Sequence, residues 1–355
     1  MFRTDFVLAP RTISVRVVVH PARSLINSML LLNITDLRSG LSEWITETAA
    51  SFTPEFARDN HIAGILAGMI PLGDDPLEFP DLIERMRRLD FTEAIPQFIS
   101  EIAEHMDVRV DDLMASRDSF IKHTAEHMIA KGEELEPEHV GAAYDLLHTP
   151  EVCGAFLTTH LQRLWDLYFA DEWNRTRSIL YETAALFDQL DLTDLTPLEA
   201  IQAVTGRDMT NFMHDEEQIN EMIFVPSLHT GPYVSNWGPD RSGRTYLVFG
   251  ARVPEGIANV STELSLRDLL TQLAALADDT RLHILSLLTQ HTELCSQDFQ
   301  HMLNLSQSAA SRHLRQLVAA GYLNERRRDL NKCFSLNGQR VQETSASLRI
   351  LLGRK

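Results

Sequence analysis

The sequence has few cysteines, no long apolar run and no low-complexity stretch. Its three cysteines, Cys153, Cys295 and Cys333, are widely separated, and none belongs to a Cys-x-x-Cys pair. An odd number of separated thiols is typical of a reducing compartment, where each serves as a small apolar core residue. The composition therefore excludes a disulfide scaffold, a collagen and a disordered chain, and we expect a cytoplasmic protein.

Membrane-spanning and exported proteins are also disfavoured. The apolar runs at residues 24–35 and 61–73, which contain no charged side chain, are only 12 and 13 residues long. A membrane-spanning helix needs roughly 18 to 20 such residues. Near the start, Asp5, Arg11 and Arg16 interrupt the apolar segment that a signal peptide would need. We therefore expect no membrane partner and no export.

The common enzyme signatures are absent, because the chain has no Gly-x-Ser-x-Gly, Gly-x-Gly-x-x-Gly or P-loop pattern. We therefore expect no enzyme, no catalytic residue and no cofactor. One alternative is a zinc-dependent peptidase, since His123, Glu126 and His127 fit the His-x-x-Glu-His pattern and Glu199 follows as a third ligand. A chain with 14 histidines and many glutamates produces this short pattern by chance, and solvated side chains on a helix are the simpler interpretation.

Charge is distributed unevenly along the 355 residues, whose net charge is -18. Residues 265–355 contain 12 Lys and Arg against 8 Asp and Glu, a balance of +4, so residues 1–264 carry -22. Phosphate repels an acidic body and attracts a basic domain, so the asymmetry indicates two domains with different partners. The turn-rich run from Val253 to Thr262 is the predicted boundary, which gives domains 1–260 and 261–355.

The pattern of the first domain predicts helices with a small sheet. Residues 13–19 alternate β-branched side chains like a strand, and apolar residues from 25 to 198 recur at three- and four-residue spacing between prolines. Residues 222–253 indicate two or three strands with a hairpin, which the first strand could join. We therefore predict a mainly α fold with small β elements (α+β).

The last 91 residues predict a winged helix-turn-helix. A helix at 266–276 precedes a second one that Asp278, Asp279 and Thr280 begin, and short helices follow at 295–303 and 307–320. Gly321 ends the fourth helix, and a hairpin with four cationic residues follows it. Helices in this order with a basic hairpin make a winged helix.

The fourth predicted helix has one apolar and one polar face. At 100° per residue Ala310 and Leu317 lie within about 60° of Leu314, which places them inward. The adjoining face carries side chains suited to base edges in a major groove, while the hairpin cations suit phosphate. The predicted DNA-binding residues are Ser306, Gln307, Ser308, Ser311, Arg312, His313, Arg315, Arg326, Arg327, Arg328 and Lys332.

At these residues the sequence resembles the ArsR-type winged-helix transcriptional regulators. The resemblance runs through Leu276–Leu285, Glu293-Leu-Cys295, Leu305-Ser-Gln307, Ser311–Leu314, Leu317, Ala320–Leu323, Arg327-Arg328 and Phe334-Ser-Leu336. It implies a homodimer that places two recognition helices in successive major grooves of double-stranded operator DNA, commonly as a repressor. The preceding domain is faintly similar to the helical domain of longer ArsR-type regulators, which implies a dimerising role or sensing of an unknown small-molecule or protein effector.

The sequence departs from that family at informative places. Ala310 stands where valine is frequent, and the hairpin turn has Leu330-Asn331 in place of Gly-Arg. The Cys-x-Cys metal site of many members is here Cys295-Ser296-Gln297, and residues 338–355 contain no His for the alternative site, so we expect no metal. A module that binds proteins is a further alternative, against which the +4 balance and the three consecutive arginines argue.

Overall fold

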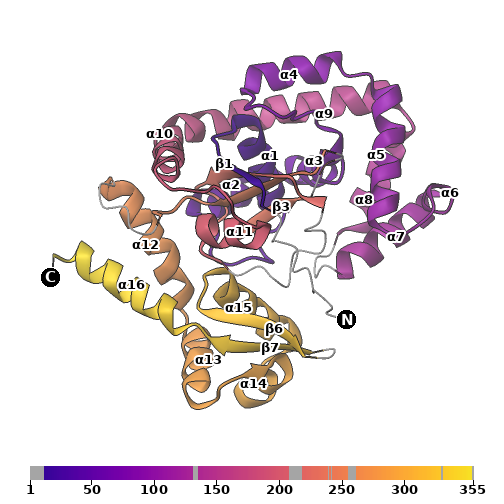
Figure 1. The fold of residues 1–355 in the computed structure, drawn as a ribbon. Coiled ribbons are helices and arrows are strands. Elements are labelled where there is room, and N and C mark those ends of the chain that lie inside the picture. Colours follow the sequence, from indigo (N-terminus) through magenta and orange to yellow (C-terminus); the bar gives the residue numbers. More distant parts are fainter. Residues whose placement is uncertain are drawn as a thin grey trace, which may run out of the picture. The chain divides into compact units, whose positions relative to one another are not determined.

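The computed structural model describes residues 12–130, 135–207, 218–238, 240, 242–254, 261–328 and 331–353 (Figure 1). Its described residues are mainly helical with two small sheets, which confirms the predicted fold class. Contacts divide the chain into two compact units. We call residues 20–37 and 43–176 the helical unit, and the rest of the described chain, which includes Arg38–Ser42, the mixed unit.

Some sequence features lie outside the described residues. They are Asp5 and Arg11 near the start, residues 255–260 of the predicted domain boundary, and Asp329 and Leu330 of the hairpin turn. The four-stranded sheet and the winged-helix segment both belong to the mixed unit. The boundary at residue 260 therefore stays a prediction.

Prolines begin several helices of the helical unit. Helices α1, α3, α8 and α9 each start at a proline, whose missing N–H and fixed φ suit a first turn. Helix α4 lies along α9 (Figure 1), where Phe79 stacks on Trp165 with 4.3 Å between ring centroids.

Among the described residues, no helix combines the length and the hydrophobicity that crossing a membrane requires. The elements are α1 (Pro21–Leu32), α2 (Glu43–Ser51), α3 (Pro54–Ile65), η1 (Ala67–Met69), α4 (Phe79–Arg88), α5 (Phe91–His105), α6 (Val110–Leu113), α7 (Arg117–Ala130), α8 (Pro137–Leu147), α9 (Pro150–Leu164), η2 (Trp165–Phe169) and the first part of α10 (Ala170–Phe187).

A four-stranded sheet lies in the mixed unit, in the order β1-β2-β4-β3. Strands β1 (Ser14–Val17) and β4 (Arg244–Gly250) are both parallel to β2 (Glu221–Ser227). Strand β3 (Val234–Trp237) is antiparallel to β4 and forms the predicted hairpin with it. The central strands β2 and β4 are buried along most of their length, as expected where both faces of a sheet are covered. Helix α11 (Pro197–Thr205) contacts β2, and the prediction that the first strand joins this sheet is confirmed.

The predicted winged helix is present in the described part of the C-terminal segment (Figure 1). Its described part has helices α12 to α15, a three-stranded sheet of order β5-β7-β6 whose first strand lies between α13 and α14, and a last helix after the hairpin. The elements are α12 (Thr262–Leu276), α13 (Asp279–Gln290), β5 (Leu294–Cys295), α14 (Ser296–Leu303), α15 (Gln307–Ala319), β6 (Leu323–Arg328), β7 (Asn331–Leu336) and α16 (Gly338–Leu351).

Local side chains fix where these helices begin and end. The N-cap side chains of Ser261, Asp278, Ser306 and Asn337 each accept a hydrogen bond from the backbone N–H three residues later. Helix α15 stops before Gly321, whose φ of +81° is accessible to glycine without strain. The predicted caps at Asp278 and Ser306 are therefore confirmed.

The core of the winged helix joins helices α12 to α15 to the hairpin of β6 and β7, which we call the wing. Ile284, Phe299, Leu317 and Tyr322 are fully buried there, and Leu314 is 1% exposed. Each such side chain stabilises the fold by about 1.5 to 3 kcal/mol relative to an exposed one. The inward face predicted for α15 is the face that this core buries.

A buried arginine connects three of these helices. Arg281 on α13 donates from Nε to the carbonyl of Ala275 at 2.6 Å and from Nη2 to the carbonyl of Ala274 at 2.9 Å. Its Nη1 donates to Oε1 of Gln316 at 2.7 Å. One guanidinium thus fixes the end of α12 and the packing of α15 on α13.

We predict that Arg281→Ala lowers the free energy of unfolding by about 3 kcal/mol, because two carbonyls and Gln316 lose a charged donor in a buried place. Urea denaturation followed by circular dichroism measures the change. The control Arg349→Ala, which removes an exposed cation from α16, changes the same free energy by less than about 0.5 kcal/mol. Equal losses in the two variants would contradict the role given to Arg281.

Candidate nucleic-acid interface

Helix α15 presents a polar row on the side away from its core. Gln307, Ser308, Ser311 and Arg312 are exposed. Ser306 precedes them and caps the helix, since its Oγ accepts a hydrogen bond from the N–H of Ala309 at 3.2 Å. The exposed side chains and the electropositive N-terminus of the helix therefore lie together, as binding to base edges and phosphate requires.

Two other predicted residues of α15 are less accessible. His313 has a side chain that is 11% exposed, and its Nδ1 lies 3.6 Å from Oδ1 of Asp278. Burial lowers the pKa of His313, which favours the neutral ring. Arg315 is half-buried and lines a cavity together with Ser311. The position of His313 favours packing on the start of α13, and its DNA contact stays a prediction.

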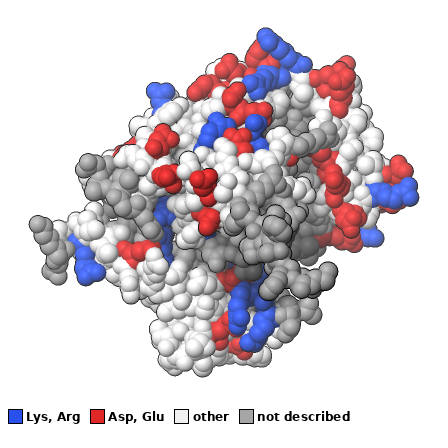
Figure 2. Space-filling view, viewed as in Figure 1, with Lys and Arg blue, Asp and Glu red and all other residues white. Residues whose placement is uncertain are grey.

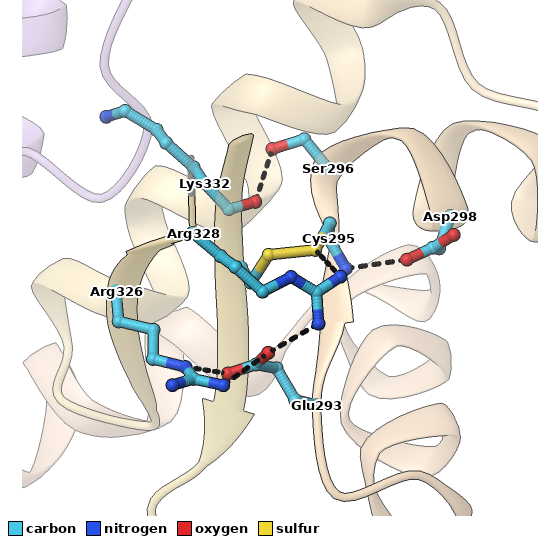
Figure 3. Close-up of a disulfide and its surroundings, with 8 residues drawn as sticks. Glu293, Cys295, Ser296, Asp298, Arg326, Arg328 and Lys332 are labelled. Atoms are coloured by element: carbon cyan, nitrogen blue, oxygen red, sulfur yellow. Dashed lines mark hydrogen bonds and ion pairs between the residues drawn. A yellow bond between two sulfur atoms is a disulfide. The ribbon is translucent and has the colours of Figure 1, made fainter. Parts of the chain in front are cut away.

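The three consecutive arginines of the wing divide between two faces of β6. Arg326 and Arg328 lie on one face with Glu293 between them (Figure 3), because successive residues of a strand point to opposite sides. Arg326 donates from Nη2 to Oε1 of Glu293 at 2.9 Å, and Nη1 of Arg328 lies 3.5 Å from the same oxygen. The hydrogen bond from Arg326 lowers the pKa of Glu293, so one ionised carboxylate serves both cations.

The other face of the wing carries Arg327 and Lys332, which are register partners on β6 and β7. Lys332 Nζ lies 3.0 Å from Oε1 of Glu325, whereas Arg327 is exposed and forms no ion pair within the described part of the chain. Figure 2 shows the basic side chains of the winged-helix part gathered beside a few acidic ones. Arg327 is therefore the wing cation most available to a phosphate.

The expectation of three free thiols is wrong for two of them. Cys295 and Cys333 form a disulfide, and Figure 3 shows it between β5 and β7. The two residues are 38 apart in sequence but are direct partners in the sheet, a pairing that spacing alone does not reveal. The bond ties the wing to the strand that precedes α14. Cys153 is free and buried as predicted, and burial raises its pKa to about 11.

The candidate metal ligands do not gather into a site within the described ranges, which hold no group of three or more His, Cys, Asp or Glu side chains able to bind a metal ion. His123 and His127 lie on α7, where Nδ1 of His123 is 4.0 Å from Glu126. Glu199 accepts hydrogen bonds from the N–H and hydroxyl of Thr196 at the start of α11. The side chain proposed as a third zinc ligand thus serves a helix cap.

Sequence reasoning did not assign roles to Arg281, Gln316 and Glu293. Gln316 is 1% exposed although it lies among polar residues of α15, and Ser39 Oγ also donates to its Oε1. The role of Glu293 could have been inferred from its place directly before β5. From there its carboxylate reaches Arg326 and Arg328, which are alternate residues of β6.

The helix-turn-helix segment is similar to that of known proteins. Residues 278–325, from the cap of α13 to β6, match the family described as bacterial regulatory protein, arsR family. The arsenic resistance transcriptional regulator ArsR1 of Pseudomonas putida is 38% identical over 87 residues, which are 24% of this chain and 68% of that protein. The chain therefore belongs to the arsR family of bacterial regulatory proteins, and it is a DNA-binding transcriptional regulator.

Proposed function

We propose that this regulator is a repressor that binds an inverted-repeat operator as a homodimer. The exposed row of α15 carries the proposal, because Gln307, Ser308, Ser311 and Arg312 stand free of the core beside a cationic wing. Arginine and glutamine side chains match the major-groove edges of guanine and adenine. Arg327 on the wing supplies a phosphate contact that sets position without reading sequence.

The two outer helices of the winged helix support the homodimer. Helices α12 and α16 pack together, and Thr344 Oγ1 on α16 donates to Oε1 of Gln272 on α12 at 2.9 Å. Their outer sides expose large apolar side chains, among them Leu270 at 54% and Ile350 at 79%. Several such residues on two adjoining helices are typical of a surface that a partner covers. The other exposed ones on this pair are Leu266, Val341 and Leu351.

A twofold dimer through these helices accounts for recognition of an inverted repeat. Two copies of α15 enter successive major grooves when they are one helical turn of DNA apart, roughly 34 Å.

We propose that residues 1–260 sense an effector that changes this binding. Residues 1–264 carry a charge of -22, which phosphate repels, so this part of the chain suits a role other than holding DNA.

The test of DNA recognition compares Arg327→Ala with Arg312→Ala. Arg327→Ala weakens binding on every sequence and reduces the salt slope by about one, because one phosphate contact is lost. Arg312→Ala relaxes base preference by about 1 to 3 kcal/mol if its contact is bidentate. Salt titrations by fluorescence anisotropy, on the upstream intergenic DNA and on random duplex, measure both quantities. An equal loss on the two DNAs for Arg312→Ala refutes base readout by this residue.

We predict that Glu293→Gln strengthens binding to both operator and random DNA. The change removes the carboxylate that Arg326 and Arg328 share, so these cations gain phosphate contacts and the salt slope becomes steeper by about one. The control Glu47→Gln makes the same change in net charge on an exposed residue of the helical unit, and it leaves the slope unchanged. An unchanged slope for Glu293→Gln would mean that the wing arginines do not reach phosphate.

We predict that Ile350→Glu dissociates the dimer, because it places a charge where an apolar contact is proposed. The dimer dissociation constant rises at least about 30-fold, as for an interface hot spot of 2 kcal/mol. Sedimentation equilibrium measures it. The control Leu167→Glu alters an apolar side chain of the helical unit that is 60% exposed, and it leaves the constant unchanged. If Ile350→Glu also leaves it unchanged, α16 is not in the interface.

A further inference from the structure

A small cavity adjoins the proposed DNA-binding side chains. It lies within the mixed unit and has a volume of about 260 Å³. Ser311 and Arg315 of α15 and Lys332 of the wing form part of its lining, and Arg38, Arg207 and Tyr233 contribute from elsewhere in the unit. The cavity therefore joins the recognition helix to residues that have no predicted role in DNA binding.

The lining of this cavity is strongly cationic. Four of its side chains are positively charged, namely Arg38, Arg207, Arg315 and Lys332, whereas Glu325 is its single carboxylate. Glu325 lies 3.0 Å from Lys332, so its charge is already engaged. Like charges that line one cavity repel one another, so the cationic lining favours a bound anion.

Arg207 has a buried donor that no group of the described chain accepts. Its Nε is buried and has no hydrogen-bond partner, and its side chain forms no ion pair with any residue that the structure describes. Burial is the main cause that lowers the pKa of Arg207 to about 10; the charge of Arg38 acts in the same direction, and Tyr233 and Glu325 act in the opposite one. A partly buried charge with an unsatisfied buried donor is unfavourable unless an anion accompanies it.

We propose that this cavity binds a compact polyanion of the phosphate type as an effector. Guanidinium groups donate pairs of parallel hydrogen bonds to phosphate oxygens, and three arginines here converge on one space. The volume is below the 300 to 1,000 Å³ typical of drug-sized ligands, so a phosphate, a diphosphate or a small phosphate ester fits. Tyr233 completes one wall, with the guanidinium of Arg38 5.4 Å from its ring centroid.

The position of the cavity connects this ligand to DNA release. A bound anion pairs with Arg315 and Lys332, which are then no longer available to DNA, so anion and operator compete. This consequence rests on the proposed function, whereas anion binding itself does not depend on it.

Binding of the anion is tested on the full chain without DNA. Isothermal titration calorimetry at constant ionic strength uses inorganic phosphate, pyrophosphate and succinate as probes, so that the arms separate phosphate chemistry from that of a carboxylate. We expect one pyrophosphate per chain, weaker phosphate and the weakest succinate. Arg207→Gln weakens pyrophosphate binding at least about tenfold, whereas Arg349→Gln, with the same loss of charge on the exposed face of α16, leaves it unchanged.

Thermal unfolding supplies a second readout that also reports whether the variant folds. Without anion, Arg207→Gln unfolds at a higher temperature than the unmodified chain, because an unpaired buried charge is gone. Pyrophosphate raises the unfolding temperature of the unmodified chain but not that of Arg207→Gln. Arg38→Gln gives an independent test from a different wall of the cavity, with the same expected loss of binding.

Several results would overturn the proposal. No binding of pyrophosphate at millimolar concentration would do so, as would equal weakening by Arg207→Gln and Arg349→Gln, which would indicate an adventitious ion only. The DNA arm is separate: pyrophosphate releases operator DNA from the unmodified chain and fails to release it from Arg207→Gln. If pyrophosphate binds at the cavity but DNA is not bound at all, the proposed function fails while the anion site stands.

Discussion

The packing of α15 depends on one buried guanidinium. Arg281 donates to two carbonyl groups at the end of α12 and to Gln316 on α15, and the three acceptors satisfy a charge that would otherwise be costly to bury. The hydrogen bond to Gln316 has a fixed direction, and it acts together with the apolar packing of Leu314 and Leu317 to define the rotation of α15 about its axis. The polar row that begins at Gln307 faces outward because this rotation is fixed.

The positive charge that the winged helix offers to DNA depends on its local ion pairs more than on its net charge. Glu293 is shared by Arg326 and Arg328, and Glu325 lies against Lys332, so the wing holds fewer available cations than its composition indicates. Such intramolecular partners compete with phosphate for the same donors, which lowers non-specific affinity. Pairing of the wing cations with Glu293 and Glu325 favours specificity for the operator over random DNA. Contacts to bases then contribute a larger share of the binding free energy.

The cationic cavity gives a physical connection between the DNA-binding residues and the rest of the mixed unit. Ser311 and Arg315 belong both to the cavity lining and to the predicted DNA contacts. A ligand changes an equilibrium only by its differential affinity for the two states. An anion that pairs with both Arg207 and Arg315 satisfies that condition. Arg315 cannot contact the anion and DNA at the same time, so the anion binds more tightly to the chain that is free of DNA.

Features that depend on near neighbours in the chain could be predicted from the sequence. Helix caps such as Asp278 and Ser306, the inward face of Ala310, Leu314 and Leu317, and the order of elements in the winged helix follow from hydrogen bonds and periodicity within a few residues. Contacts between distant segments could not be predicted in this way. They are the parallel pairing of β1 with β2, the disulfide of Cys295 with Cys333, and the place of Arg207 beside Arg315 in the lining of the cavity. These contacts depend on strand register and on how loops pack. Periodicity in the sequence does not indicate which residues far apart in the chain come into contact.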